Sequence, residues 1–235
     1  MIHEDITLGP VRLIRGDCTL IAPTLEGVDA VITDPPYGMN WDTDSTRFSG
    51  GGRSDYGEIA EDSRSFDPSP WIQYQKCVLF GSNHFGQRLQ VGTTLVWVKK
   101  HEHLFGTFLS DAEVAWMKGG HGVYVMKHSF PPPARKLDAG IDPLTPSIHP
   151  TQKPVALMSW CMDMAKVQPG QLILDPYMGS GTTLIAAIRT GRRAIGIEID
   201  ERHFRTAVER VKRELAQPML PAMAPQRVEQ QDLIA

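Results

Sequence analysis

Short apolar runs that alternate with helical patterns are the feature that most limits how this chain can fold. Runs of this length predict buried strands, and their alternation with helices predicts a largely parallel sheet covered on both faces. The seven runs rich in Val, Ile and Leu are residues 28–33, 77–81, 93–98, 113–117, 122–126, 171–175 and 194–199. We therefore expect an α/β fold.

Three helices are indicated by apolar residues at helical spacing. Pro154 suits the first turn of one helix, whose apolar face is formed by Leu157, Met158, Cys161 and Met164. A second helix is expected over residues 182–190, closed by Gly191. The third covers residues 201–216, and its apolar stripe predicts packing in the core rather than a ligand site.

Length and composition describe an ordinary globular protein. The chain has 235 residues, 41% of them hydrophobic and 22% charged, which suits one well-buried domain. The net charge of −3 produces no overall attraction to a polyanion, so contacts with nucleic acid would need a local basic patch. No apolar run approaches the length of a membrane span, and the first residues lack the pattern of a signal peptide. We expect a cytoplasmic protein without a membrane partner.

Three segments look irregular. Residues 39–70, which contain SGGGRSD, are too long for a simple connection, and we expect either a mobile lid or a disordered insertion. Residues 127–150 are proline-rich and locally basic. Residues 217–235 are expected to form a C-terminal tail that is mobile or contacts a partner.

The stretch VITDPPYG, residues 31–38, joins the end of an apolar run to two prolines. Consecutive prolines cannot continue a hydrogen-bonded ladder, so the strand must end there. Asp34 and Tyr37 should then lie side by side at the carboxyl end of a strand, where open α/β sheets bind ligands. A plain surface turn after the strand is the alternative.

The stretch DPYMGSGTT, residues 175–183, follows one predicted strand and precedes a helix. Gly179 and Gly181 let the backbone approach a ligand at the helix N-terminus, and Glu198, at the end of the next strand, suits ribose hydroxyls. The glycine spacing of a dinucleotide fingerprint and the lysine of a P-loop are both missing. The pattern indicates a cofactor that has a ribose but no pyrophosphate.

Three motifs in this order resemble those of the DNA amino-methyltransferases, in the permuted β group whose catalytic tetrapeptide precedes the cofactor loop. They are TDPPYG (33–38), HPTQKP (149–154) and DPYMGSGTT (175–183). Together with RGDC and GIEID, the resemblance spans residues 12–215, nearly the whole chain.

This resemblance implies a Rossmann-like, S-adenosylmethionine-dependent methyltransferase fold with a mostly parallel seven-stranded sheet and helices on both faces. It also implies a single methyltransferase domain over residues 1–216, in which residues 127–150 are a short target-recognition segment. The resemblance further implies that the partner is double-stranded DNA, that the target base is flipped out of the duplex, and that the protein serves in restriction-modification.

The resemblance also implies S-adenosylmethionine as the methyl donor and assigns its contacts by position. Its main cradle would be formed by Asp175, Gly179, Ser180, Gly181 and Thr182. Glu198 would contact the ribose, and Thr151 and Lys153 would hold the methionine end, where an ammonium can meet a carboxylate. Asp17 would approach the adenine ring, although a turn acid after a strand fits this residue equally. The family usually has Phe in place of Tyr177, so this chain adds a hydroxyl near the sulfonium.

The tetrapeptide Asp34-Pro35-Pro36-Tyr37 suits attack by an exocyclic amine, whose lone pair is delocalised into the ring. Asp34 and the carbonyl of Pro35 can each accept a hydrogen bond from the amine, which directs the lone pair toward the methyl group. Pro35 and Pro36 stiffen these acceptors, and Tyr37 offers a stacking face for a flipped base. Alignment then supplies most of the catalysis, without a metal or a covalent intermediate.

The leading interpretation is a DNA adenine N6-methyltransferase, because Asp at the first tetrapeptide position usually accompanies adenine in this family. Cytosine N4 methylation, which usually accompanies Ser there, is the alternative. Protein glutamine methylation typically shows Asn at this position and has its cofactor loop first, and both features oppose it. A non-catalytic DNA-binding module should show degraded motifs, whereas these are intact.

Other chemistries fit the sequence poorly. Methylation at cytosine C5 needs a cysteine nucleophile, usually after proline, but Cys18, Cys77 and Cys161 follow Asp, Lys and Trp. Their odd number and wide separation argue against disulfides and zinc, so we expect buried or idle thiols. The HEH stretch at 101–103 lacks zinc-protease spacing and is expected to be a surface or DNA-facing loop.

DNA recognition falls to the two irregular segments, 39–70 and 127–150. Most of their cations should contact phosphate rather than base edges, namely Arg47, Arg53, Arg64, Lys127, Arg135 and Lys136. Because these two segments are short, we expect the protein to recognise a short or loosely defined DNA sequence, unless a second subunit of a homodimer supplies further contacts.

Overall fold

The computed structural model describes residues 2–37, 65–107, 110–130 and 152–217. Thr151 lies outside these ranges, and so do most of the predicted loop 39–70, recognition segment 127–150 and C-terminal tail. Predictions for those residues therefore stay predictions.

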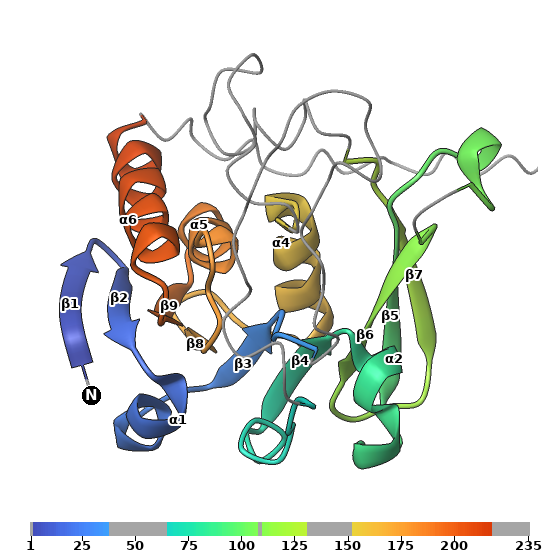
Figure 1. Ribbon diagram of the computed structural model, residues 1–235, viewed down its shortest axis with the longest axis horizontal. Helices are drawn as coiled ribbons and strands as arrows, with labels where there is room; N and C mark the ends of the chain where they lie inside the picture. Colours follow the sequence, from blue (N-terminus) through green and yellow to red (C-terminus); the bar gives the residue numbers. More distant parts are fainter. Residues whose placement is uncertain (1, 38–64, 108–109, 131–151, 218–235) are drawn as a thin grey trace, which may run out of the picture.

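Within the described residues, nine strands form a single sheet in the order β1-β2-β9-β8-β3-β4-β6-β5-β7 (Figure 1). Their bounds are β1 Ile2–Leu8, β2 Val11–Gly16, β3 Ala30–Thr33, β4 Lys76–Phe80, β5 Thr93–Val98, β6 Ala112–Met117, β7 Val123–Lys127, β8 Leu172–Asp175 and β9 Arg193–Glu198. All seven predicted runs form strands, β3 to β9. The expected count of seven was too low, because β1 and β2 extend the sheet beyond β9.

The sheet is mostly parallel, as predicted. Strands β2, β9, β8, β3 and β4 run parallel to their neighbours in that order. Strand β6 is antiparallel to both β4 and β5, so β5 and its parallel neighbour β7 point the same way as β4. The carboxyl ends of β2, β9, β8, β3, β4, β5 and β7 therefore meet at one edge of the sheet.

The three predicted helices are confirmed, and two short helices join them. Pro154 is the N-cap of the first, immediately before its first turn, and Asp200 caps the third through the His203 amide. The helices are α1 Cys18–Ile21, α2 Ser82–Phe85, α4 Val155–Met164, α5 Thr182–Arg189 and α6 Glu201–Ala216. No helix in the described part of the chain is long and apolar enough to cross a membrane.

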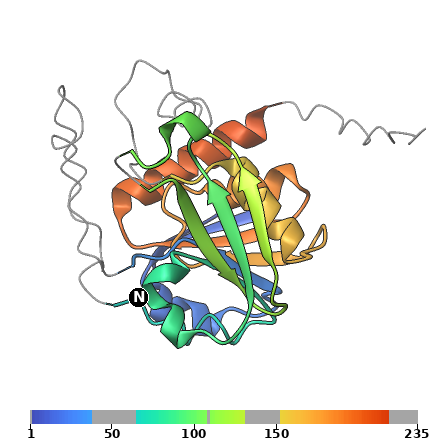
Figure 2. The ribbon, with the colours of Figure 1, turned by 90° about the vertical axis from the view of Figure 1, so that its right-hand side faces the viewer.

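Alternate residues of the strands face two separate cores, as the pleat of a sheet requires. On one face, Ile32 packs in a cluster with Leu157 of α4 and Phe204 of α6. On the other face, Val31 packs in a cluster with Ile21 of α1 and Phe85 of α2. The helices thus cover both faces of the sheet (Figure 2), which leaves its carboxyl edge as the place for a site.

Candidate active site

The two predicted motifs at strand ends meet at neighbouring strands. The stretch from Asp34 to Tyr37 leaves β3, and Asp175 ends β8, which lies beside β3 in the sheet. The hydroxyl of Thr33 donates a hydrogen bond of 2.6 Å to Oδ1 of the buried Asp175 carboxylate. This bond ties the tetrapeptide to the glycine-rich loop that follows β8.

The Asp34 carboxylate has a different partner on each oxygen. The hydroxyl of Tyr37 donates to Oδ1, and the ammonium of Lys153 lies 2.5 Å from Oδ2. Lys153 is almost fully buried, whereas the Asp34 side chain keeps 23% of its surface exposed. The third motif, HPTQKP, thus reaches the tetrapeptide through its lysine.

Glu113 of β6 completes this charged cluster, although no local pattern in the sequence points to it. Its Oε2 lies 3.0 Å from Nζ of Lys153, and its Oε1 accepts a 2.7 Å hydrogen bond from Lys99. Burial alone would raise the Glu113 pKa, but the two ammonium groups bring it down to about 2. Burial opposes the charged form of Lys153, and the carboxylates of Asp34 and Glu113 nevertheless raise its pKa well above the usual value.

Tyr37 is held by its ring as well as by its hydroxyl. Its ring stacks on His84, with the ring centroids 5.0 Å apart and the planes 15° from parallel. On Gly81, whose φ is +70°, an added Cβ would lie 2.0 Å from the Tyr37 ring. Burial first, and then the Asp34 charge, raise the Tyr37 pKa well above 10, so the phenol stays a hydrogen-bond donor.

The loop Gly179–Thr182 packs tightly against α6. Gly181 has a φ of +81°, and a Cβ there would lie 3.0 Å from Cβ of Ala207. Arg210, itself buried, donates bonds of 2.7 and 2.9 Å to the carbonyl and hydroxyl oxygens of Ser180. These contacts fix the backbone just before the N-terminus of α5, where free amide groups suit an electronegative ligand atom.

Two carboxylates beside this loop have raised pKa values. Burial raises the Glu198 pKa to about 7, although its oxygens accept hydrogen bonds of 2.9 Å from the Gly179 amide and 2.8 Å from the Asp200 amide. Burial also raises the Asp175 pKa to about 6, against the opposing hydrogen bonds from Thr183 and Thr33. Perturbed acids gathered in one place are typical of ligand sites.

Two further predicted contacts sit at the same edge. The Tyr177 ring meets Trp71 and Phe66 edge to face, at centroid distances of 5.8 and 6.0 Å. Asp17, just after β2, accepts 2.8 and 2.6 Å bonds from the amide and hydroxyl of Thr19 and caps α1. This capping role agrees with the interpretation of Asp17 as an acid in a turn after a strand. Its approach to a cofactor stays a prediction.

The cysteines lie in the interior, as expected. Cys18, Cys77 and Cys161 are all buried, and burial raises the pKa of Cys77 to about 12. A thiol with so high a pKa is a weak nucleophile at neutral pH.

The arrangement joins two halves of one site at the carboxyl edge of the sheet. One half is a partly exposed carboxylate beside a partly buried tyrosine, with the Pro35 carbonyl next to it in the chain. The other is a glycine-rich loop at a helix N-terminus with Glu198 at the end of the next strand. Together they can position a planar amine against a ligand that carries a ribose.

Known sequences resemble this chain over part or most of its length. Residues 124–209 match a family model described as DNA methylase. The putative methylase YubD of Escherichia coli K12 is 27% identical over 222 residues, which cover 85% of this chain and 89% of that protein. The type II methyltransferase M2.DpnII of Streptococcus pneumoniae is 44% identical over 66 residues, 28% of this chain and 24% of its own length.

Solved structures share the fold at low sequence identity. The PvuII DNA methyltransferase, described as cytosine-N4-specific, matches with a TM-score of 0.56 and 15% identity, over 92% of this chain and 94% of that one. The M1.HpyAVI complex with SAM matches with a TM-score of 0.54 and 22% identity, over 86% and 98%. These likenesses confirm the Rossmann-like methyltransferase fold.

Proposed function

This chain belongs to the DNA amino-methyltransferase family, and from that premise we propose that it methylates the exocyclic N6 amine of adenine in double-stranded DNA. S-adenosylmethionine is the proposed methyl donor. The observation that carries the proposal is the position of the Asp34 carboxylate. Its two oxygens are held by Tyr37 and Lys153, beside the glycine-rich loop.

The position of the Asp34 carboxylate, held by Tyr37 and Lys153, suits the chemistry of an aromatic amine. Asp34 keeps part of its surface exposed, so a free lone pair of its carboxylate can accept a hydrogen bond from one N–H of the amine. The carbonyl of Pro35 accepts from the other N–H, and the nitrogen lone pair then points at the methyl group. The buried Lys153 supplies the counter-charge, and the Tyr37–Asp34 bond holds the carboxylate in one orientation.

Tyr37 supplies the face on which the target base stacks. An enzyme that acts on a base must extrude it from the duplex, and an aromatic ring replaces part of the stacking that the base loses. His84 and the Gly81 backbone hold the Tyr37 ring. The ring is therefore oriented before the base arrives.

The residues beside β8 and β9 fit S-adenosylmethionine. Its ribose hydroxyls would donate to Glu198, and its sulfonium would lie near Tyr177, beside the loop formed by Asp175, Gly179, Ser180, Gly181 and Thr182. Thr151 and Lys153 would bind its methionine carboxylate, so that Lys153 serves both the cofactor and Asp34. When bound, the cofactor supplies an activated methyl group. Two solved structures with this fold, M1.HpyAVI and TTHA0409 of Thermus thermophilus, are described as complexes with this compound.

Adenine is preferred over cytosine because Asp occupies the first tetrapeptide position. Methylation of cytosine N4 is the second candidate, and the description of the PvuII enzyme as cytosine-N4-specific favours keeping it. Both amines present the same two N–H donors to Asp34 and Pro35. We further propose one methyltransferase domain over residues 1–216 that acts in the cytoplasm, alone or as a homodimer.

Single-molecule sequencing of DNA from cells that express this chain tests the proposal. We expect N6-methyladenine at one short sequence context, absent from cells that express Asp34→Ala. N4-methylcytosine instead would move the assignment to the second candidate. DNA indistinguishable from that of Asp34→Ala cells, with the folded protein present, would contradict the proposed function.

A further inference from the structure

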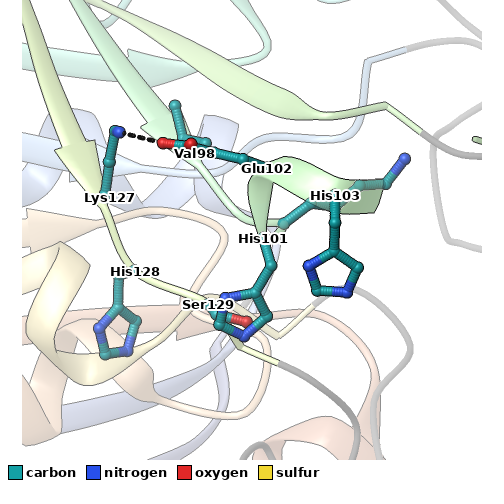
Figure 3. A pocket seen from close by; sticks show the side chains of 8 residues that line it. Val98, His101, Glu102, His103, Lys127, His128 and Ser129 are labelled. Atoms are coloured by element: carbon teal, nitrogen blue, oxygen red, sulfur yellow. Dashed lines mark hydrogen bonds and ion pairs between the residues drawn. The ribbon is translucent and has the colours of Figure 1, made fainter. Parts of the chain in front are cut away.

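A hollow of about 590 Å³ lies away from Asp34, where β5 and β7 end. It is lined by residues at the end of β5, in the turn of 3-10 helix Glu102–Leu104, and at the end of β7 (Figure 3). Hydrogen-bond donors dominate its polar lining, which includes Lys127, His101, His103, His128 and Ser129.

The walls of this hollow are fixed by the fold. The backbone of His128 donates a 3.1 Å bond to the Val98 carbonyl and accepts a 2.8 Å bond from the Trp97 indole. Lys100 bonds to Asp111 at 2.9 Å and to the Thr107 carbonyl at 3.2 Å, which closes the loop behind the hollow. The donors of the hollow are thus held on ordered backbone.

Two groups of donors occupy different parts of the hollow. His101 and His103 stack with centroids 5.8 Å apart and planes 13° from parallel, and Figure 3 shows their rings and that of His128 pointing away from Lys127. No hydrogen bond between described residues engages these three rings. Lys127 instead pairs with Glu102 at 2.7 Å, with 70% and 75% of the two side chains exposed. Such an exposed pair is weak, so the ammonium can exchange this partner for an anion.

The hollow faces the same sheet edge as the candidate active site. Strands β5 and β7 are the third and fourth neighbours of β3 along the sheet, and their carboxyl ends point the same way. With strands roughly 4.8 Å apart, the hollow lies roughly 14–19 Å from the strand that carries Asp34. A DNA strand advances about 3.4 Å per nucleotide, so this distance corresponds to roughly four to six nucleotides.

The charges at the two ends of this edge differ. The end near β2 and β9 carries four carboxylates, and the ion pairs among the described residues engage only two of them. Glu201 pairs with Arg15 at 3.5 Å and with Arg205 at 3.4 Å, and Asp200 pairs with Arg202 at 3.6 Å. The four are Asp17, Glu198, Asp200 and Glu201. Among the described residues, the end near β5 and β7 has one lysine for each of Glu102, Asp111 and Glu113 and adds three imidazoles. A nucleic-acid strand with one base at Asp34 is therefore repelled less if it extends along this edge toward β7 than if it extends toward β2.

We propose that this hollow binds the sugar-phosphate backbone of DNA four to six nucleotides from the target base. The proposal rests on the proposed function and deepens it by giving the direction in which the flanking duplex leaves the active site. Phosphate oxygens replace Glu102 on Lys127 and accept hydrogen bonds from the imidazoles. Such contacts fix the register of the duplex without selecting its sequence.

The test compares Lys127→Gln with Lys212→Gln by fluorescence anisotropy on a labelled duplex at several salt concentrations. Lys212 is a matched control because it is also exposed and pairs with a glutamate, Glu209, at 2.9 Å, but on α6. We expect Lys127→Gln to lower the slope of log K against log salt by about 0.9 and to weaken binding about fivefold near 0.15 M salt. Lys212→Gln should match the wild type.

Glu102→Gln supplies a test with the opposite sign. Removing the carboxylate that competes with phosphate should strengthen binding a few-fold, on every duplex sequence alike. Weaker binding by this variant, or equal slopes for Lys127→Gln and the wild type, would overturn the proposal. Anisotropy measures binding without methyl transfer, so the two proposals can fail separately. If the wild type binds and methylates DNA and Lys127→Gln binds normally, only the proposed role of the hollow is refuted. A wild type that does neither would refute the proposed function itself.

Discussion

The ammonium of Lys153 lies 2.5 Å from Oδ2 of Asp34, although 119 positions separate the two residues in the chain. This contact brings the motifs HPTQKP and DPPY into one partly buried charge cluster, which Glu113 and Lys99 complete. Removing one member leaves another charge without its partner in a place that water reaches poorly. The cluster should therefore respond strongly to substitution.

Glu113→Gln should destabilise the fold by about 2 kcal/mol at pH 7, below the value for a fully buried pair because Glu113 is 28% exposed. The Glu113 pKa falls from 4.5 to about 2 in the folded state, so its contribution is complete above pH 4.5 and disappears as the pH falls toward 2. Urea denaturation at several pH values measures this. The control, Glu209→Gln, breaks an exposed pair and should cost less than about 1 kcal/mol. Equal effects of both substitutions would contradict the role given to Glu113.

Gly81→Ala should reduce methyl transfer by tenfold or more, because its Cβ would displace the Tyr37 ring. Gly27→Ala is the control, since Gly27 has the same φ of +70° but no atom within 4 Å of the added Cβ. Both variants should lose about 1–2 kcal/mol of stability from the left-handed backbone. Steady-state methylation assays on DNA separate them, and similar activities would show that Tyr37 does not need this position.

Affinity for S-adenosylmethionine should rise with pH through about 7. The Glu198 carboxyl, whose pKa burial raises to about 7, accepts hydrogen bonds from ribose hydroxyls more strongly when it is ionised, so protonation weakens binding. Below pH 7 the titration of Glu198 alone should lower the affinity by at most about tenfold per pH unit, and the fall should become steeper near pH 6, where Asp175 also titrates. Calorimetry between pH 6 and 8.5 measures the effect. Glu198→Gln should bind more weakly with a flatter profile, whereas a flat wild-type profile would remove Glu198 from the ribose site.

Changing Cys18, Cys77 and Cys161 together to Ala should leave most of the activity. All three thiols are buried, and the Cys77 pKa of about 12 leaves almost no thiolate at neutral pH. Some loss of stability is expected from lost packing, and thermal unfolding would quantify it. A well-folded triple variant with no methyl transfer at all would reopen covalent catalysis.

Local patterns predicted much of the fold. Strands β3, β4, β8 and β9 and helices α4, α5 and α6 follow from apolar patterns because each buries most of the residues that define its pattern. Strands β5 and β6 bury fewer of theirs, and the edge strand β7 buries none, although their apolar runs also predicted strands. Strand β1 was missed because it is an edge strand that buries none of its residues and has charged residues among its apolar ones. Strand β2 was missed because Arg12 and Arg15 interrupt its short apolar run, even though Leu13 and Ile14 are fully buried.

The site was predicted where its motifs are local and missed where contacts join distant segments. The sequence placed Asp34 and Asp175 at strand ends, and neighbouring strands bring them together. Glu113 sits inside an apolar strand, and nothing local shows that Lys153 will lie against it. The contact between Lys153 and Asp34 depends on how α4 docks, which strand patterns do not encode.

Mass spectrometry of nucleosides from DNA incubated with purified protein and methyl-deuterated S-adenosylmethionine tests whether Asp34 aligns an adenine amine for methyl transfer. We predict deuterated N6-methyladenine from the wild type, and at least about a hundredfold less from Asp34→Ala, because that variant lacks the acceptor that aligns the amine. Both proteins should bind the cofactor with similar affinity. A near-normal yield from Asp34→Ala would contradict the account, and so would a wild type that leaves every nucleoside unlabelled.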